Sequence, residues 1–340
     1  MNFKNTFMLL GATALLAACA VQSTTEATKP NEARSGLWGM NKQADLQVDN
    51  EKAFAGVNKV IIGSFKVGFL EGKKDSAKAG SGMGGKATAK TSLEGLTPAV
   101  MQAVTDAAYK DFVTSLETKG YTVADRSQLL ADAEYAGTES SPSPLREEAS
   151  FFGSANTVTY VAPSGFEGIR FFIGEAGKGT GLGAMNGPWA KAIKFAKNTG
   201  IPVLSVYYLV DYANTAGNVS HYALMSSVNV GQGISATIGS GVMLVGGEAG
   251  GTFGPNPNGS VKLGQAVFSE EKFGELRQDT TGAGVAAEVA LNIFTSALGG
   301  GSNQTREFTI VADPAKYQQV ASNVLGQANN VLVSKMASMK

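Results

Sequence analysis

The chain has 340 residues, and its 28 basic and 28 acidic side chains give a formal net charge of +0. Composition therefore provides no electrostatic case for binding nucleic acid or another polyanion. Charged residues make up 16%, below the usual ~25%, and the 43 glycines are nearly twice the ordinary share of ~7%. Hydrophobic content of 43% suffices for a sizeable core, and the glycines predict many tight turns or closely packed backbones.

The N-terminus has the parts of an export signal. Lys4 supplies a positive charge, and residues 7–16 form an apolar run too short for a bilayer, which takes ~20 residues. The segment Leu-Ala-Ala-Cys that ends at Cys19 resembles the lipobox of bacterial lipoproteins. The resemblance implies that residues 1–18 are a signal peptide and that Cys19 carries the acyl chains, palmitate among them. The alternative is an ordinary secretory signal with an incidental cysteine.

Position 20 is Ala, whereas Asp after the lipidated cysteine favours inner-membrane retention in Gram-negative lipoproteins. The resemblance therefore implies an outer-membrane anchor, with the folded part in the periplasm. Cys19 is the only cysteine, so no intramolecular disulfide can form. Polar residues dominate up to about residue 42, and residues 19–58 are predicted to be the lipidated cysteine and a polar tether.

The first half of the folded part is predicted to be a strand, a loop and a helix that leads into further strands. The strand covers 59–69, and the Gly-, Lys- and Ser-rich stretch over 72–90 is expected to be a mobile loop. Thr97 and Pro98 are typical of a helix start, and Gly120 of a helix end. Further elements expected before residue 220 are a strand at 121–124, a helix from Ser127 to Tyr135, a loop at 137–147, strands at 157–162 and 168–173, a helix at 188–197 and a strand at 201–212.

Residues 219–268 read as an antiparallel Gly-rich meander of two or three strands. From Val228 to Ile238 the apolar residues fall mostly on even positions, which gives one apolar and one polar face. Two interpretations fit: a sheet that covers the core, which we favour, or a pore hairpin in a ring of subunits, since a lone protomer cannot close open edges in lipid. A helix at 284–298, a strand at 306–311 and a helix from Asp313-Pro314 follow.

The order of elements predicts an α/β (α+β) fold, a two-layer or three-layer domain over 59–340 with the meander inserted. The strand ending near Phe69, the helix from Thr97, Gly120-Tyr-Thr-Val and Arg126-Ser-Gln-Leu129 together resemble the periplasmic α/β domain of curli-secretion-type lipoproteins and of related cell-wall-synthase activators and flagellar outer-membrane lipoproteins. The resemblance covers about 59–135, and the segment 137–154 is longer than that family pattern.

No catalytic constellation is evident. His221 is the only histidine and is expected in a solvated turn, so a triad or a zinc site lacks partners, and we expect no metal and no cofactor. The stretches 80–87 and 174–183 fail the phosphate-loop pattern, because Ala87 replaces the magnesium-binding hydroxyl and Gly179 separates Lys178 from Thr180. The aromatic pairs at 151–152, 171–172 and 207–208 are interpreted as core residues, with a carbohydrate-binding or peptidoglycan-binding surface as the alternative.

The sequence thus favours a non-enzymatic outer-membrane lipoprotein that serves as an assembly or interaction module. Its expected partners are membrane lipid through Cys19 and either further copies of itself, for which a ring is one form, or another envelope protein; nucleic acid is not expected. The alternatives are a module that binds an envelope polymer, peptidoglycan or polysaccharide, and an unrecognised enzyme.

Overall fold

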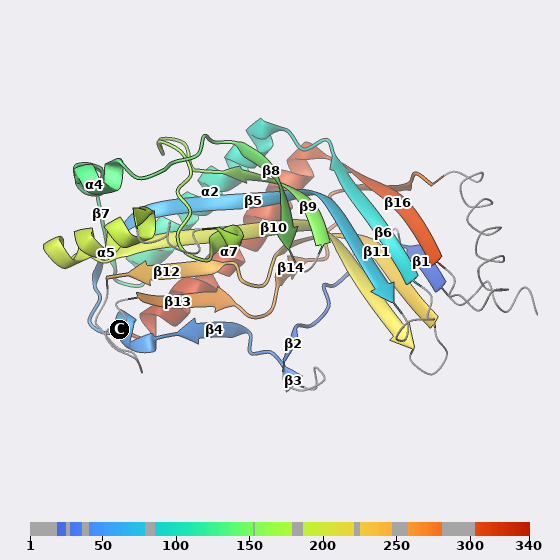
Figure 1. Ribbon diagram of the computed structural model, residues 1–340, viewed down its shortest axis with the longest axis horizontal. Coiled ribbons are helices and arrows are strands. Elements are labelled where there is room, and N and C mark those ends of the chain that lie inside the picture. Colours follow the sequence, from blue (N-terminus) through green and yellow to red (C-terminus); the bar gives the residue numbers. More distant parts are fainter. Residues whose placement is uncertain are drawn as a thin grey trace, which may run out of the picture.

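The computed structural model describes residues 19–24, 28–35, 41–78, 86–151, 154–178, 186–220, 225–246, 258–280 and 303–340 (Figure 1). A 14-stranded mixed sheet with parallel and antiparallel pairs carries helices on its faces, which confirms the α/β class. The main strands are β1 (Cys19–Ser23), β4 (Leu46–Asp49), β5 (Lys59–Lys78), β6 (Lys86–Glu94), β7 (Thr122–Ala124), β8 (Leu145–Phe151), β9 (Ser154–Val161), β10 (Val203–Ser220), β11 (Met225–Ala236), β12 (Gly241–Val245), β13 (Asn258–Leu263), β14 (Val267–Ser269), β15 (Gly274–Gln278) and β16 (Asn303–Ala312). The remaining described elements are β2 (Arg34–Ser35), β3 (Asn41–Lys42), the helices α2 (Pro98–Thr118), α3 (Ser127–Leu130), α4 (Ala133–Ala136), α5 (Pro188–Thr199) and α7 (Pro314–Ala337), and the 3-10 turns η2 (Glu51–Phe54) and η3 (Glu175–Gly177).

Two long strands organise the sheet. β5 has 20 residues and β10 has 18, whereas a typical strand has about 5–6. They pair in parallel only over their first halves, from Val203↔Ile61 to Val210↔Phe69. Beyond that point β5 pairs with β6 and β10 pairs with β11, both antiparallel, and the two hairpins run side by side away from the helices (Figure 1). We call the helix-covered half the body, and the half built by the second halves of β5 and β10 with β1, β6, β11, β15 and β16 the arm.

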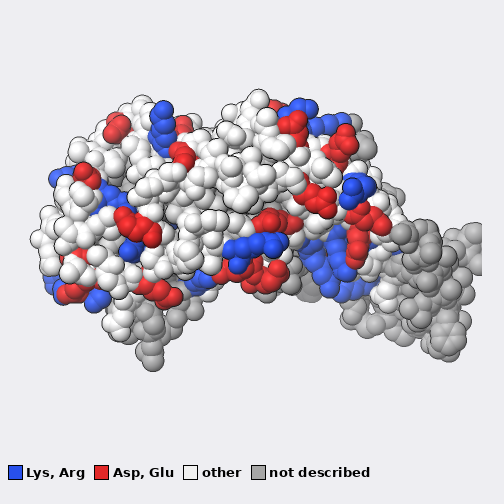
Figure 2. Space-filling view, turned by 90° about the horizontal axis from the view of Figure 1, so that it is seen from above, with Lys and Arg blue, Asp and Glu red and all other residues white. Residues whose placement is uncertain are grey.

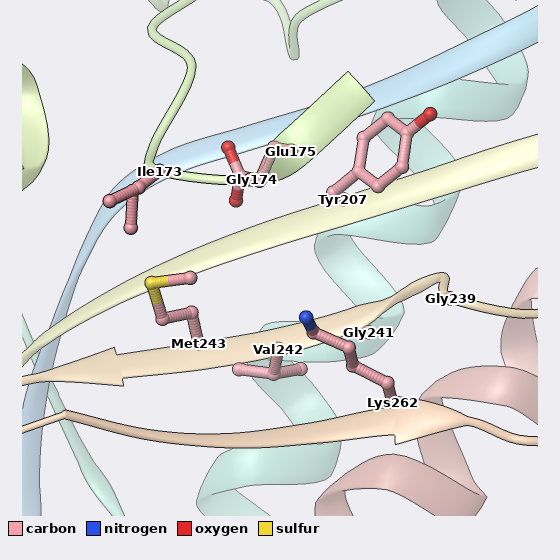
Figure 3. Close-up of a pocket in the computed structure, with 9 residues that line it drawn as sticks. All are labelled: Ile173, Gly174, Glu175, Tyr207, Gly239, Gly241, Val242, Met243 and Lys262. Carbon is pink, nitrogen blue, oxygen red and sulfur yellow. The ribbon is translucent and has the colours of Figure 1, made fainter. Parts of the chain in front are cut away.

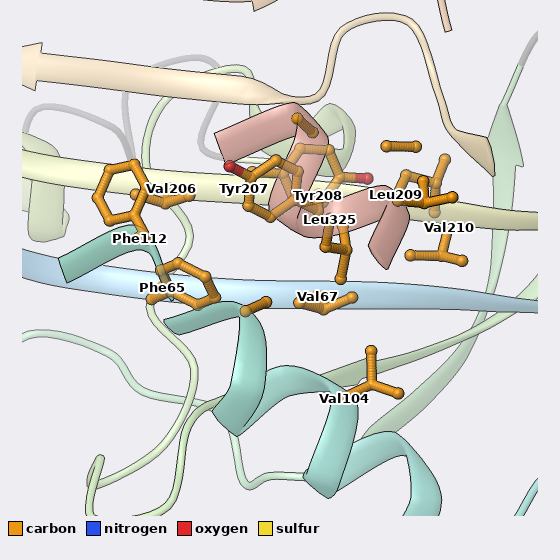
Figure 4. Packing of buried hydrophobic residues seen from close by; sticks show 14 of the residues in the cluster. Phe65, Val67, Val104, Phe112, Val206, Tyr207, Tyr208, Leu209, Val210 and Leu325 are labelled. Atoms are coloured by element: carbon orange, nitrogen blue, oxygen red, sulfur yellow. The ribbon is translucent and has the colours of Figure 1, made fainter. Parts of the chain in front are cut away.

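The body has three layers. Alternation along β5 and β10 sends Ile62 and Leu204 to the face covered by α2 and α7, while Ile61 and Val203 pack with residues of α3, α4 and α5 on the other face. Figure 4 shows the larger core, where aromatic and aliphatic side chains of both strands meet the two long helices. The helix starts are as predicted: Thr97 caps α2 and Asp313 caps α7, each with Pro in the first turn.

Two expected elements are wrong. The stretch 72–90 is the end of β5 and the start of β6, with only 79–85 outside the described residues. Its small residues Ala77, Ala87 and Ala89 are buried in a cluster with residues of β11 and β16. Small residues, which are typical of loops, here allow strands to pack closely against one another. The predicted strand at 168–173 forms only an isolated bridge between Ser141 and Ile169. The predicted helix over 127–135 is divided, because Asp132 caps α4 separately.

The meander is antiparallel as expected, but it is not a separate unit. β12 pairs with the first half of β10 and β11 with the second half, so the segment completes both body and arm. The even-numbered residues Val228, Val230, Ile234 and Ala236 are all buried inside the protein. Part of this face packs on Ala87, Ala89 and Phe308 across the arm. The period-two pattern is thus accounted for by an internal interface between two sheets.

The described parts of the N-terminal segment lie against the arm and the body. β1 pairs in parallel with β11, and Thr28 donates its backbone N–H to Gln232 and its hydroxyl to the carbonyl of Asn214, 3.0 and 3.3 Å away. Thr28 also occupies the space that a side chain at Gly231 would need. Further along, β4 pairs with β13, and Phe54 is fully buried in the body. Tertiary structure therefore begins well before residue 59.

Replacing Phe112 tests the core. Its ring is fully buried and lies 5.8 Å from that of Phe65, centroid to centroid. Phe112→Ala should lower the free energy of unfolding by about 3–5 kcal/mol, because it leaves a cavity between α2 and β5. Urea denaturation measures the change. The matched control is Lys110→Ala on the exposed side of the same helix, which should stay within about 0.5 kcal/mol of wild type. Equal midpoints for the two variants would contradict this packing.

Candidate functional site

A buried lysine lies at the centre of the body. The side chain of Lys66 is 0% exposed, and its Nζ lies 2.6 Å from a carboxylate oxygen of Glu175. The same ammonium donates to the hydroxyls of Ser64 and Ser205, 3.0 and 3.1 Å away. Ser205 in turn donates to the other oxygen of Glu175 at 2.6 Å. These four side chains form one closed polar network in an otherwise apolar interior.

Strand geometry and a tight loop position the network. Ser64 and Lys66 are two residues apart on β5, and Ser205 is the register partner of Ser64 on β10. Glu175 comes from η3, in a loop where Gly174, Ala176 and Gly177 all have positive φ. Such conformations favour glycine and are uncommon for alanine, so the loop is held in a tight shape. The backbone N–H of Phe172 also donates to Glu175, at 2.7 Å, and fixes the carboxylate over Lys66.

Burial controls the electrostatics of this pair. Removal from water lowers the pKa of the Lys66 ammonium, and the carboxylate of Glu175 opposes that shift. A lysine beside serine hydroxyls can serve as a general base in hydrolases only when it is neutral and open to substrate. Here Lys66 and Ser205 are both fully buried, and Lys66 is paired with a carboxylate. The network is therefore arranged to hold the loop on the sheet.

A small pocket adjoins the outer side of this network. It is lined by side chains and backbone of Glu175, Tyr207, Met243, Lys262 and neighbouring residues (Figure 3). Its volume is about 50 Å³, whereas pockets for drug-sized ligands have roughly 300–1,000 Å³. The pocket has room for water molecules but not for an organic substrate.

Arg126, which the family pattern singled out, forms a second charged cluster. Its guanidinium lies over the ring of Phe166, 4.1 Å from the centroid, and donates to both oxygens of Glu167 at 2.7 and 2.6 Å. Arg126 precedes α3, and Leu129 of that helix is fully buried. The pattern Arg-x-x-Leu thus attaches α3 to the body, with the arginine on the 166–167 turn and the leucine in the core.

Cys19, the predicted lipidation residue, is the first residue of β1, and its backbone pairs with Ser226 of β11. Its side chain lies outside what the structure describes, so lipidation stays a prediction. His221 and the predicted helix at 284–298 also fall outside the described residues.

The two glycine-rich stretches do not have phosphate-loop geometry where they are described. Lys86 is the first residue of β6 and is followed by a buried Ala87, while the next helix begins only at Pro98. A phosphate loop instead joins a strand directly to a helix N-terminus. Lys178 lies 2.7 Å from Glu147 in an ion pair and 4.8 Å from the ring centroid of Phe171.

The described aromatic pairs pack internally. Phe171 makes an edge contact with Tyr160 at 5.2 Å, and Tyr208 is fully buried with its hydroxyl 2.6 Å from Asn329. Asp111 of α2 accepts a hydrogen bond from Asn329 of α7 at 2.7 Å and links the two helices. Sequence reasoning missed Lys66, Glu175 and Asn329. The available signal for Lys66 was a lone cation inside the apolar run Val60–Phe69.

Within the described residues, no group of three His, Cys, Asp or Glu side chains could hold a metal ion. No described helix is long and apolar enough to cross a membrane. Comparison of the chain with protein-family models, with curated proteins and with solved structures gave no match.

Neutralising one partner of the buried pair tests its role. Glu175→Gln should cost about 3–5 kcal/mol of stability, because it leaves the charge of Lys66 buried and uncompensated. The double variant Lys66→Met/Glu175→Gln removes both charges and should recover most of that loss. Urea denaturation measures both. The control is Glu51→Gln, which removes an exposed partner of Lys335 and should cost at most about 1 kcal/mol. A Glu175→Gln loss no larger than the control would show that Lys66 is not held as a buried charge.

Proposed function

We propose that this protein is a non-enzymatic lipoprotein of the outer membrane, anchored through Cys19, whose periplasmic domain serves as an interaction or assembly module. The observation that carries the proposal is the place of the lipobox cysteine. Cys19 opens β1, and β1 is an integral strand of the arm, paired with β11 along its whole length. An acyl chain on Cys19 would therefore attach the folded domain directly, at one defined end.

The buried polar chemistry supports a non-enzymatic role. The most deeply buried cation, Lys66, is engaged by Glu175 and two serines. Arg126 and Lys178 are likewise engaged by carboxylates of the same chain. The pocket beside Glu175 is too small for an organic substrate. Each of these groups has a structural partner that accounts for it.

The shape of the molecule favours interaction with other macromolecules. The arm extends the sheet well past the helices, since β5 alone spans about 66 Å at 3.3 Å per residue (Figure 1). Among the described residues only Val311 and Val331 are large hydrophobic side chains with substantial exposure. The partner, a second copy of this chain or another envelope protein, would thus meet a largely polar surface, as in many non-obligate complexes.

Lipid anchoring is tested at positions 19 and 20. Cells labelled with a palmitate analogue should incorporate label into wild type and into Ala20→Ser but not into Cys19→Ser, because the thiol is the only acyl acceptor at this site. Ala20→Asp should keep the label and shift the protein from the outer to the inner membrane fraction. Label on Cys19→Ser equal to that on wild type would refute the anchor.

Assembly is tested on the acylated protein extracted in detergent. Size exclusion with light scattering should give the mass of several chains of residues 19–340 for a self-assembling module, or of a hetero-complex for a module that binds another envelope protein. Chemical cross-linking in intact cells before extraction protects complexes that detergent would dissociate. A monomer that cross-links to nothing in cells would contradict the interaction role.

A further inference from the structure

Lysines face each other across the β5–β6 hairpin of the arm. The register pairs Lys74 with Lys90 and Lys78 with Lys86, directly opposite on the two strands. The side chains of Lys74 and Lys90 are exposed, and that of Lys86 is partly exposed. In Figure 2 basic and acidic side chains lie next to one another over the arm, at the right of the view. We call this face of the hairpin, given by the register positions 74, 78, 86 and 90, the lysine face.

The pairing of lysines with lysines lowers the stability of this hairpin. Like charges directly opposite on antiparallel strands are destabilising, and this hairpin has two such pairs, separated on the same face by the pair Ser76↔Thr88. Lys90 is compensated by Glu307 of β16, with 2.8 Å between the charged atoms. For Lys74 and Lys86, the described part of the chain provides no carboxylate within ion-pair distance. Lys74 and Lys86 are thus cations without an ion-pair partner among the described residues, in a chain whose total charge is balanced.

The opposite side of the same hairpin explains why the lysines point outward. Ala77, Ala87 and Ala89 alternate with the lysine positions and are buried against Val228, Val230 and Phe308. The inner face of the hairpin is therefore fixed by the core of the arm. On the other face of the hairpin Lys74 and Lys90 are exposed and Lys86 is partly exposed, whereas Thr88 between Lys86 and Lys90 is buried.

Cys19 lies at the same end of the arm. β1 contacts β6 and β16, and the backbone N–H of Val21 donates to the side chain of Gln304 at 2.6 Å. Gln304 is the register partner of Ala87, next to Lys86. β1 runs parallel to β11, from the hairpin end toward the body, so Cys19 lies about 7 Å beyond Val21 toward the end of the arm.

From this placement we propose that the lysine face docks on the anionic headgroups of a lipid bilayer. The proposal rests on the lipid anchor at Cys19 proposed above. The anchor is on β1, which pairs with β11, and the lysines are on β5 and β6, which pack against β11. Packed sheets are about 10 Å apart, so the anchor and the lysines can reach the same membrane surface. That spacing is close to the Debye length of ~8 Å at physiological salt, within which surface charge is felt. A basic patch is a common second attachment signal beside an acyl chain, and it would orient the arm on the membrane.

Vesicle flotation tests the docking without acyl chains. Residues 19–340 carrying Cys19→Ser should bind phosphatidylcholine vesicles that contain phosphatidylglycerol more tightly than pure phosphatidylcholine vesicles, and high salt should abolish the difference. Adding Lys74→Gln, Lys78→Gln and Lys86→Gln should weaken binding about a hundredfold, because each lysine near an anionic surface contributes roughly fivefold. Lys74→Gln alone, at an exposed position, should weaken it about fivefold.

The matched control replaces three exposed lysines of the body, Lys110, Lys197 and Lys316, by Gln in the same background. It has the same net charge as the test variant and should bind as the parent does. Equal losses in both triple variants, or no preference for phosphatidylglycerol, would overturn the docking. Binding of a soluble anionic polymer with the same lysine dependence but no binding to vesicles would also overturn the lipid assignment.

The two proposals fail separately. If Cys19 is acylated but the protein shows no preference for anionic vesicles, the proposed anchor stands and the proposed docking face is refuted. If Cys19 is not labelled with palmitate but binding to vesicles still depends on the lysines, the proposed anchor is refuted and the proposed docking face stands. Thermal unfolding shows whether the test variant is folded: its midpoint should equal or exceed that of the parent, because the like-charge pairs are gone.

Discussion

The parallel pairing of β5 and β10, and the point where it ends, determine the rest of the structure. Up to Phe69 and Val210 the strands form the centre of the body, and past these residues each takes a different hairpin partner. Lys73 of β5 bridges the divergence with a 2.7 Å ion pair to Asp211 of β10. Burial disfavours its charge, but Asp211 and Asp75 outweigh that effect and raise the pKa of Lys73. Body and arm are thus joined by continuous backbone and by a buried ion pair.

Lys66, which is buried, and Lys73, which is partly buried, have distinct structural roles in β5. Lys66, in the body, holds the loop that contains Glu175 on the sheet, whereas Lys73 holds β10 where the arm begins. A buried charge is costly unless it is paired and hydrogen-bonded, so each lysine permits only one arrangement of the segments around it. Lys74, the next residue of the same strand, is exposed and free of that requirement. Lysines of β5 therefore fix the fold at positions 66 and 73, and a lysine is open to solvent at position 74.

The proposed anchor and the proposed docking face give the arm a common orientation. Strands β1, β6, β11 and β16 all start at the end of the arm away from the helices, which brings segments distant in sequence to one place. With acyl chains at Cys19, that end would rest on the membrane and the body would project into the periplasm. A partner would then meet the helices and the outer strands of the body.

Sequence alone determined the elements whose signals are local. Thr97-Pro98 and Asp313-Pro314 start helices as predicted, because capping acts within a few residues. Only tertiary structure decided that 72–78 and 86–90 are strand, that Glu175 pairs with Lys66, and that Lys90 faces Glu307 across 217 positions of sequence. Sheet pairing and the burial of charge depend on partners distant along the chain, and local composition does not specify them.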